Sequence, residues 1–381
     1  MSDIEARNIG HLPYLDGLRG VAILSVFLYH TLGPSFGFDQ LPWAGNFRDI
    51  HQHLDFLFVY PLSYGHLGVS VFFVISGYCI HLSHSKNNIG GWPAFFIRRF
   101  FRIYPAYLFA LGLFLFLSPW TCLVDRPNML EQLTANVFAV QNLWEHLRWG
   151  INPSFWSIAA EIQLYMLYPL LMILVRRLGW DRSLLLVAGL ELLLRILPLL
   201  LTLLNAGTVP YMVRSSALGY WGSWTIGAYL AQHHQRGRGA LFNRMRFDVF
   251  VILVVLSALL KPTSVLTFPL CAMTTAIVMD RFHTGRWKLP TTGKLSGAWR
   301  LLCNLGVVSY SFYLFHQPIL VWTGRELFRS IPSLLELLCL AMFFPLVLGI
   351  AYAGYRLLEQ PSIALGKRVL SALYGRSKRP A

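Results

Sequence analysis

The chain has 381 residues, of which 55% are hydrophobic and only 13% are charged, and its mean hydropathy is +0.52. Soluble domains carry about a quarter charged residues, so this composition excludes an ordinary soluble protein and indicates an integral membrane protein. The net charge of +15 does not indicate nucleic-acid binding, because the basic residues lie in short clusters between apolar runs.

Apolar stretches of about 17–25 residues predict an all-α integral membrane fold, a bundle of about ten transmembrane helices. In chain order the predicted spans are 17–36, 66–83, 105–123, 155–175, 183–204, 212–231, 247–261, 264–280, 303–324 and 334–358. The seventh and eighth are short and are separated by Lys261 and Pro262, so a re-entrant pair is the alternative there. The stretch 131–143 is too short and polar to span, and we expect it at the surface.

Most of the 32 Lys and Arg residues fall on one side of these spans, which predicts that both termini are cytoplasmic. The opposite side carries two long segments, 37–65 and 124–154, which are large enough to shape an extracytoplasmic binding surface. We expect one transmembrane domain at 1–366 and a basic cytoplasmic tail at 367–381. The five cysteines lie in apolar stretches without CxxC spacing, which favours buried hydrophobic side chains over a metal site.

The first span begins with LDGLRG and carries one histidine far inside. Arg19 and His30 are eleven residues apart, so both project from one helix face. At about 1.5 Å per residue they are separated by roughly 16 Å along the helix axis. A cation at the membrane surface, aligned with a titratable base in the hydrocarbon, predicts a membrane enzyme built around His30.

Three ionisable side chains on different spans are predicted to reach one depth, slightly outside the midplane. These are His30, His316 and Glu161, each roughly 18–20 Å from the cytoplasmic edge. Ionisable groups at this depth are functional candidates, although each could also be a satisfied buried polar group. Tyr165 shares a helix face with Glu161. Glu191 and Arg195 differ, because a spacing of four residues on one helix favours an internal ion pair.

Two further polar features are an arginine cluster at the membrane surface and a pair of hydroxyl residues inside the second span. Arg98, Arg99 and Arg102 in FFIRRFFRIYP could anchor lipid headgroups or recognise phosphate, whose oxygens match the planar fork of arginine. Ser76 and Tyr78 supply hydroxyl groups inside the second span, where helix packing is as good an explanation as catalysis.

Five motifs in order carry a resemblance: LDGLRGVAILSVFLYH, GVSVFFVISGY, RRFFRIYP, FWSIAAEIQLYMLYP and SYSFYLFHQPIL. Together they resemble acyltransferase family 3. The resemblance implies transfer of an acyl group, usually acetyl, from cytoplasmic acyl-CoA to a hydroxyl of an extracytoplasmic or lipid-linked glycan. It implies a multi-pass protein of the bacterial inner membrane, with acetyl-CoA as co-substrate, no permanently bound cofactor, the lipid bilayer as surroundings and no nucleic-acid partner. We expect no SGNH esterase-like domain in this chain.

This resemblance and the chemistry of the residues suggest three groups of site residues. His30 would be the general base, and Glu161 or Asp16 could orient it or contact the acceptor; a covalent acyl-histidine intermediate stays open. The phosphates of the donor would lie at the cytoplasmic end, with the thioester delivered to His30. The predicted catalytic residues are His30 and Glu161; the donor-binding residues are Arg19, Arg98, Arg99 and Arg102; the supporting or acceptor residues are Asp16, Ser76, Tyr78, Tyr165 and His316; no metal ligand is predicted.

The main alternative is a transporter or flippase that uses the buried His and Glu side chains as a proton relay. The sequence lacks the paired interrupted helices and the internal repeat that many transporters have. A third possibility is an acyltransferase of the membrane-bound O-acyltransferase type, which acts on lipid or protein. It would explain the buried histidine but not the order of the motifs.

Overall fold

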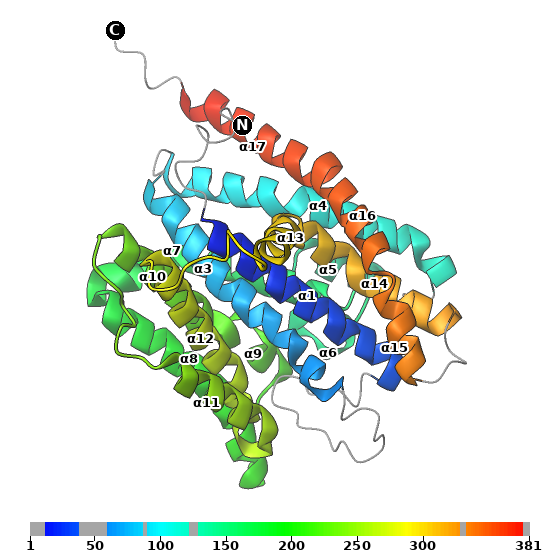
Figure 1. The fold of residues 1–381 in the computed structure, drawn as a ribbon, viewed down its shortest axis with the longest axis horizontal. Coiled ribbons are helices and arrows are strands. Elements are labelled where there is room, and N and C mark those ends of the chain that lie inside the picture. The colour runs from blue at the N-terminus through cyan, green and yellow to red at the C-terminus, as the bar shows by residue number, and fades with distance from the viewer. Residues whose placement is uncertain (1–11, 38–58, 87–89, 122–128, 328–332, 376–381) are drawn as a thin grey trace.

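The computed structural model describes residues 12–37, 59–86, 90–121, 129–327 and 333–375, and these residues form helices and turns without a strand. The all-helical prediction is therefore confirmed for this part of the chain. Figure 1 shows the arrangement. The first half contains α1 (Pro13–Phe36), η2 (Tyr60–Leu67), α3 (Gly68–Lys86), α4 (Gly91–Thr121), α5 (Met129–Val137), η3 (Gln141–Leu143), α6 (Glu145–Arg148), α7 (Phe155–Leu178) and α8 (Trp180–Leu203).

The second half is also helical, and several of its apolar runs are divided into shorter helices. It contains α9 (Tyr211–Ser215), η4 (Ala217–Tyr220), α10 (Trp221–Gln235), α11 (Phe247–Leu259), η5 (Lys261–Leu266), α12 (Thr267–His283), α13 (Ser296–Val307), α14 (Ser309–Leu327), α15 (Ser333–Ala341), α16 (Phe344–Gly354), η6 (Tyr355–Glu359) and α17 (Gln360–Tyr374).

Seven helices of the described residues are long and apolar enough to cross a membrane. They are Pro13–Phe36, Tyr60–Ser85, Gly91–Leu117, Phe155–Leu178, Trp180–Leu203, Thr263–His283 and Leu334–Tyr374. Of the other predicted spans, 247–261 forms an apolar helix of 13 residues, whereas 212–231 and 303–324 are each divided into shorter helices. As predicted, 131–143 does not form a spanning helix, because α5 has only nine residues.

Helix α1 lies at the centre of the bundle, against α3, α13 and α14 (Figure 1). Its backbone approaches α13 so closely that glycine is needed at the contact. A Cβ added to Gly20 would lie 2.0 Å from the carbonyl oxygen of Leu302, and one added to Gly306 would lie 1.8 Å from that of Asp16. Small residues allow helix backbones to approach closely in a membrane bundle. These two glycines therefore determine how α1 and α13 cross.

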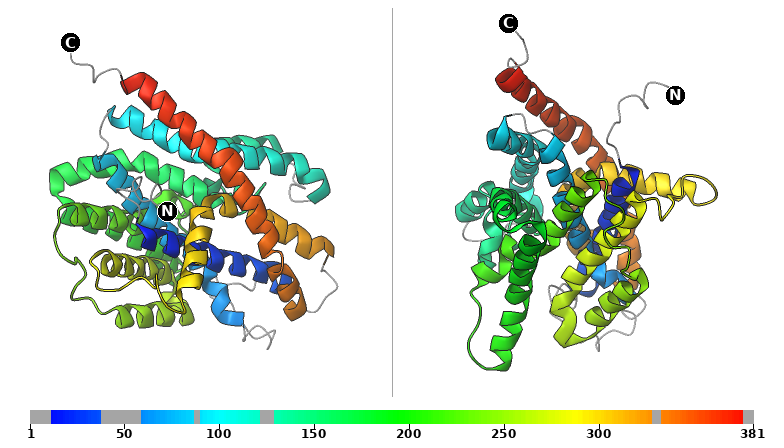
Figure 2. Two further views of the ribbon diagram at one scale, coloured as in Figure 1. Left: turned by 45° about the horizontal axis from the view of Figure 1, so that its top comes forward. Right: turned by 90° about the vertical axis from the view of Figure 1, so that its left-hand side faces the viewer.

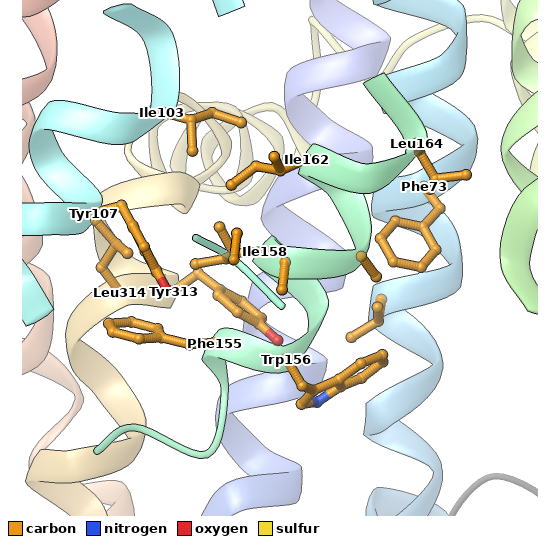
Figure 3. Close-up of a cluster of buried hydrophobic side chains, with 14 of the residues drawn as sticks. Phe73, Ile103, Tyr107, Phe155, Trp156, Ile158, Ile162, Leu164, Tyr313 and Leu314 are labelled. Carbon is orange, nitrogen blue, oxygen red and sulfur yellow. The ribbon is translucent and has the colours of Figure 1, made fainter. Parts of the chain in front are cut away.

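The main core lies around α7, between α3, α4 and α14. Figure 3 shows part of it, with Phe155 and Ile158 of α7 beside Tyr313 of α14. On the outside, α17 lies alongside α4, and Figure 2 shows the two helices from two further directions. The Ser362 hydroxyl donates a hydrogen bond to the Phe101 carbonyl at 2.6 Å. The expected division between residues 366 and 367 falls inside α17, which continues as one helix to Tyr374.

Candidate active site

A cavity of about 150 Å³ lies between α1, α3, α4, α7 and α14. Its wall contains both polar and apolar side chains. The polar lining residues are Arg19, Ser76, Cys79, Arg99, Arg102, Ser157, Glu161, Tyr165, Ser309, Tyr310 and Tyr313. Three arginines and one carboxylate line it, and two of the arginines, Arg19 and Arg102, are paired with carboxylates that do not line it, Asp16 and Glu359.

The three arginines reach the cavity from two helices. Arg19 of α1 is paired with Asp16, with 2.9 Å between its Nη1 and the Asp16 Oδ1, and it donates to the Cys79 sulfur at 3.2 Å. Arg99 and Arg102 come from α4, and Arg99 donates to the Ser83 hydroxyl at 3.3 Å. The structure thus brings together three of the four arginines predicted to bind the donor. Arg98, the fourth, does not line the cavity.

Glu161 lies on the cavity wall with two of the predicted supporting residues. Its Oε1 accepts hydrogen bonds from the Ser76 hydroxyl at 2.7 Å and the Tyr165 hydroxyl at 2.5 Å. Ser76 in turn accepts a hydrogen bond from the Trp224 indole at 3.2 Å. Among the described residues, no hydrogen bond links Glu161 to His30 or His316. The three side chains expected at one depth therefore do not form one cluster. His30 and His316 contact each other, whereas Glu161 lies on the cavity wall with the arginines.

His30 and His316 form a pair between α1 and α14. The His30 Nδ1 lies 3.0 Å from the His316 Nε2 and 2.9 Å from the Val26 carbonyl oxygen. The His316 Nδ1 lies 2.9 Å from the Tyr313 carbonyl oxygen. A carbonyl oxygen only accepts, so each Nδ1 must carry a hydrogen. In neutral rings, the one Nδ1–H of His30 is then shared between the Val26 carbonyl and the His316 Nε2, and the Nε2 of His30 keeps a lone pair for a reacting group.

Tyr313 contacts both the cavity and the histidine pair. Its side chain lines the cavity, and its hydroxyl is 2.7 Å from the Ser157 hydroxyl of α7. Its own carbonyl holds His316, as described above. In Figure 3 the Tyr313 ring lies among the α7 side chains Phe155, Trp156 and Ile158. The arginine-lined cavity and the histidine pair are therefore neighbouring parts of one site.

Tyr78 belongs to a different cluster on the other face of α3. Its hydroxyl lies 3.1 Å from the His234 Nδ1, and the His234 Nε2 lies 2.9 Å from the Asp280 Oδ1. The Tyr14 hydroxyl lies 3.4 Å from that of Tyr78. Tyr78 does not line the cavity, so of the two hydroxyl residues predicted in the second span only Ser76 reaches it.

The clearest residue that sequence reasoning missed is Glu359, which lies one position after the last predicted span. Arg102 donates to this buried carboxylate, and the Ser311 hydroxyl donates to its Oε2 at 2.9 Å. Ser311 and Tyr313 lie inside the motif SYSFYLFHQP, so that motif contained signals beyond its histidine. Glu359 ends a π-helical turn, Tyr355–Glu359, a backbone irregularity often found at functional sites.

Glu191 and Arg195 form the internal ion pair that their spacing predicts. The Arg195 Nε lies 3.0 Å from the Glu191 Oε1, and Arg195 also donates to the Gly219 carbonyl at 2.8 Å. The Ser223 amide and hydroxyl both donate to Glu191. This pair does not line the cavity, so the structural interpretation is confirmed.

Comparison with known proteins identifies the family. The family model for the Acyltransferase domain matches residues 12–356, which include every site residue described so far except Glu359. The chain belongs to acyltransferase family 3. This membership and the seven long apolar helices fit a multi-pass membrane protein, with an acyl donor, an acyl acceptor and a lipid bilayer as its partners.

Relatives of this family 3 protein come from Staphylococcus aureus. "O-acetyltransferase OatA" of strain NCTC 8325 / PS 47 is 30% identical over 177 residues, which are 42% of this chain and 24% of the relative. "Putative O-acetyltransferase SACOL0978" of strain COL is 27% identical over 183 residues, or 44% of this chain and 26% of the relative. The match thus spans about a quarter of the length of these relatives. No solved structure matches the chain.

Proposed function

We propose that the protein is a transmembrane O-acyltransferase that moves an acetyl group from cytoplasmic acetyl-CoA to a hydroxyl of an extracytoplasmic or lipid-linked carbohydrate. His30 is the catalytic base. The observation that carries this proposal is the His30–His316 pair, which lies next to a cavity lined by three arginines. The names of the two relatives support O-acetyl transfer as the reaction.

The proposed topology has ten spans, both termini in the cytoplasm and residues 1–366 as the transmembrane domain, in a bacterial inner membrane. The orientation rests on the distribution of Lys and Arg, which are more frequent in cytoplasmic loops. In this orientation Arg19 lies at the cytoplasmic end of α1 and His30 lies about 16 Å further outward on the same face. The donor would then enter from the cytoplasm, where acyl-CoA is made.

Acetyl-CoA would bind with its charged groups toward the arginines and its pantetheine arm in the narrow cavity. Arginine suits this role because its planar fork matches phosphate oxygens. Arg19, Arg99 and Arg102 line the cavity, and Arg98 precedes Arg99 in α4. Glu161, which lies with the arginines, contributes on the donor side, with Ser76 and Tyr165 holding its carboxylate. No other cofactor is needed.

In the transfer step, the His30 Nε2 takes the proton from the acceptor hydroxyl. The hydroxyl oxygen forms a bond to the thioester carbonyl carbon, the carbon–sulfur bond breaks, and the departing thiolate takes up the proton to give CoA. The His316 Nε2 accepts the hydrogen bond of the His30 Nδ1–H throughout, which stabilises the imidazolium while it exists. An orienting group behind a catalytic base acts in this way in hydrolase triads.

The proposal is tested by His30→Ala, with His146→Ala as the matched control. His146 is an exposed histidine that faces Glu131 at 3.2 Å, away from the cavity. Mass spectrometry of the surface glycan of the producing cell should show loss of O-acetyl groups for His30→Ala alone, with both variants still inserted. Purified wild-type protein should release thiol from acetyl-CoA in the presence of that glycan. Normal acetylation with His30→Ala would refute the proposal.

A further inference from the structure

Arg102 differs from the other two arginines of the cavity in having a deeply buried acidic partner. The Glu359 side chain is 0% exposed, whereas the Arg102 side chain is 40% exposed. Arg102 thus has two sides, one turned to a carboxylate within the protein and one turned to the cavity. The two residues are 257 positions apart, so only the tertiary fold brings them together.

The Glu359 carboxylate is held from a second direction as well. The Ser311 hydroxyl of α14 donates to its Oε2 at 2.9 Å, while Arg102 donates to its Oε1. The turn that carries Glu359 is π-helical and contacts both α4 and α14. Three separate elements therefore converge on this one carboxylate.

A buried carboxylate does not readily give up its cation. Moving Arg102 away would leave the fully buried Glu359 carboxylate as an uncompensated charge, which is strongly unfavourable. Arg102 consequently stays beside Glu359 whether or not the cavity is filled, and Glu359 cannot act as a latch that a ligand displaces. Instead, the ion pair restricts the rotation of the long Arg102 side chain. The N–H groups that do not bind Glu359 therefore keep one direction.

We propose that Glu359 is a positioning residue for the acyl donor: it aims the Arg102 guanidinium into the cavity, where acetyl-CoA binds. The inference rests on the proposed function and adds to it a residue outside the family match, which ends at residue 356. Helix α14 carries both Ser311, which holds Glu359, and His316, which holds His30. The donor end and the base end of the site are thus supported by one helix.

The test measures the affinity of purified full-length protein for acetyl-CoA by isothermal titration calorimetry. Glu359→Gln removes the charge but keeps the shape, and we expect its dissociation constant to rise about tenfold, because the freed guanidinium no longer points at the donor. The rate of transfer to the surface glycan at saturating acetyl-CoA should stay close to wild type, since Glu359 does not contact the histidine pair. Glu359→Asp, which restores the charge, should recover part of the affinity.

Glu191→Gln is the matched control, because Glu191 also forms a buried pair with an arginine but lies away from the cavity. Its affinity for acetyl-CoA should equal that of wild type. A double-mutant cycle adds a measurement that a general loss of packing would not reproduce. In an Arg102→Ala background, Glu359→Gln should cause no further loss of affinity, because there is no guanidinium left to aim.

The outcomes separate the two proposals. If wild-type protein does not bind acetyl-CoA, the proposed function is wrong. If wild type binds it and Glu359→Gln binds equally well or more tightly, only the positioning role is overturned, and tighter binding would show that Glu359 competes with the donor. If Glu359→Gln does not fold, Ser311→Ala replaces it: this change removes one hydrogen bond to Glu359 and should weaken acetyl-CoA binding about threefold. Wild-type affinity in Ser311→Ala would then refute the role.

Discussion

The Nε2 of His316 lies 3.0 Å from the Nδ1 of His30, although the two residues are 286 positions apart. The backbone carbonyls of Val26 and Tyr313 determine the hydrogens on both rings. They leave the Nε2 of His30 with the lone pair that a general base needs. The site therefore contains a base and a group that orients it, on two neighbouring helices.

His316→Ala should lower the maximal rate of acetyl transfer about 100-fold, within the usual range for a group that assists proton transfer. The affinity for acetyl-CoA should be unchanged, because His316 does not line the cavity. His316→Gln retains an acceptor oxygen and should recover part of the rate. The check is the initial rate of thiol release at saturating acetyl-CoA, and a rate equal to wild type in His316→Ala would contradict the orienting role.

Arg99→Ala should weaken acetyl-CoA binding about tenfold, a loss of about 1.4 kcal/mol. The reason is that Arg99 has no acidic partner among the described residues; its hydrogen bond goes to Ser83, and its guanidinium lies 5.8 Å from the centre of the Phe95 ring. Arg98→Ala should have a smaller effect, because Arg98 does not line the cavity. Calorimetric titration with acetyl-CoA measures both variants, and an equal loss in both would indicate a diffuse basic surface instead.

Gly306→Ala should destabilise the protein by about 3 kcal/mol, because the new methyl group overlaps the Asp16 carbonyl and forces α1 and α13 apart. Gly112→Ala is the control: it lies in α4 with nothing within 4 Å of the added methyl group, so it should be neutral or slightly stabilising. Thermal unfolding in detergent, followed by circular dichroism, compares them. Equal melting temperatures would mean that the close contact of α1 and α13 is absent.

Glu191→Gln should lower the free energy of unfolding by about 2 kcal/mol, because it leaves the buried Arg195 without its counter-charge. Acetyl transfer by the folded protein should be normal, since neither residue lines the cavity. Thermal unfolding and thiol release on the same preparation provide the two measurements. Loss of acetyl transfer without loss of stability would show that this pair has a functional role and not a structural one.

The sequence by itself determined the features that depend on local order. Long apolar runs predict helices, because a segment in a membrane must satisfy its own backbone hydrogen bonds. A spacing of eleven residues places Arg19 and His30 on one helix face, and a spacing of four pairs Glu191 with Arg195. These relationships lie within single helices, so neighbouring helices do not alter them.

Only the tertiary structure decided which side chains meet across helices. Depth along the membrane placed Glu161 level with His30 and His316, but depth does not determine how a helix is rotated or which helix is its neighbour. The packing of α3, α4 and α7 turns Glu161 toward the arginines, whereas α14 brings His316 to His30. Glu359 reaches Arg102 through a turn that no local pattern indicated, because a contact between residues 257 positions apart depends on how the helices are packed.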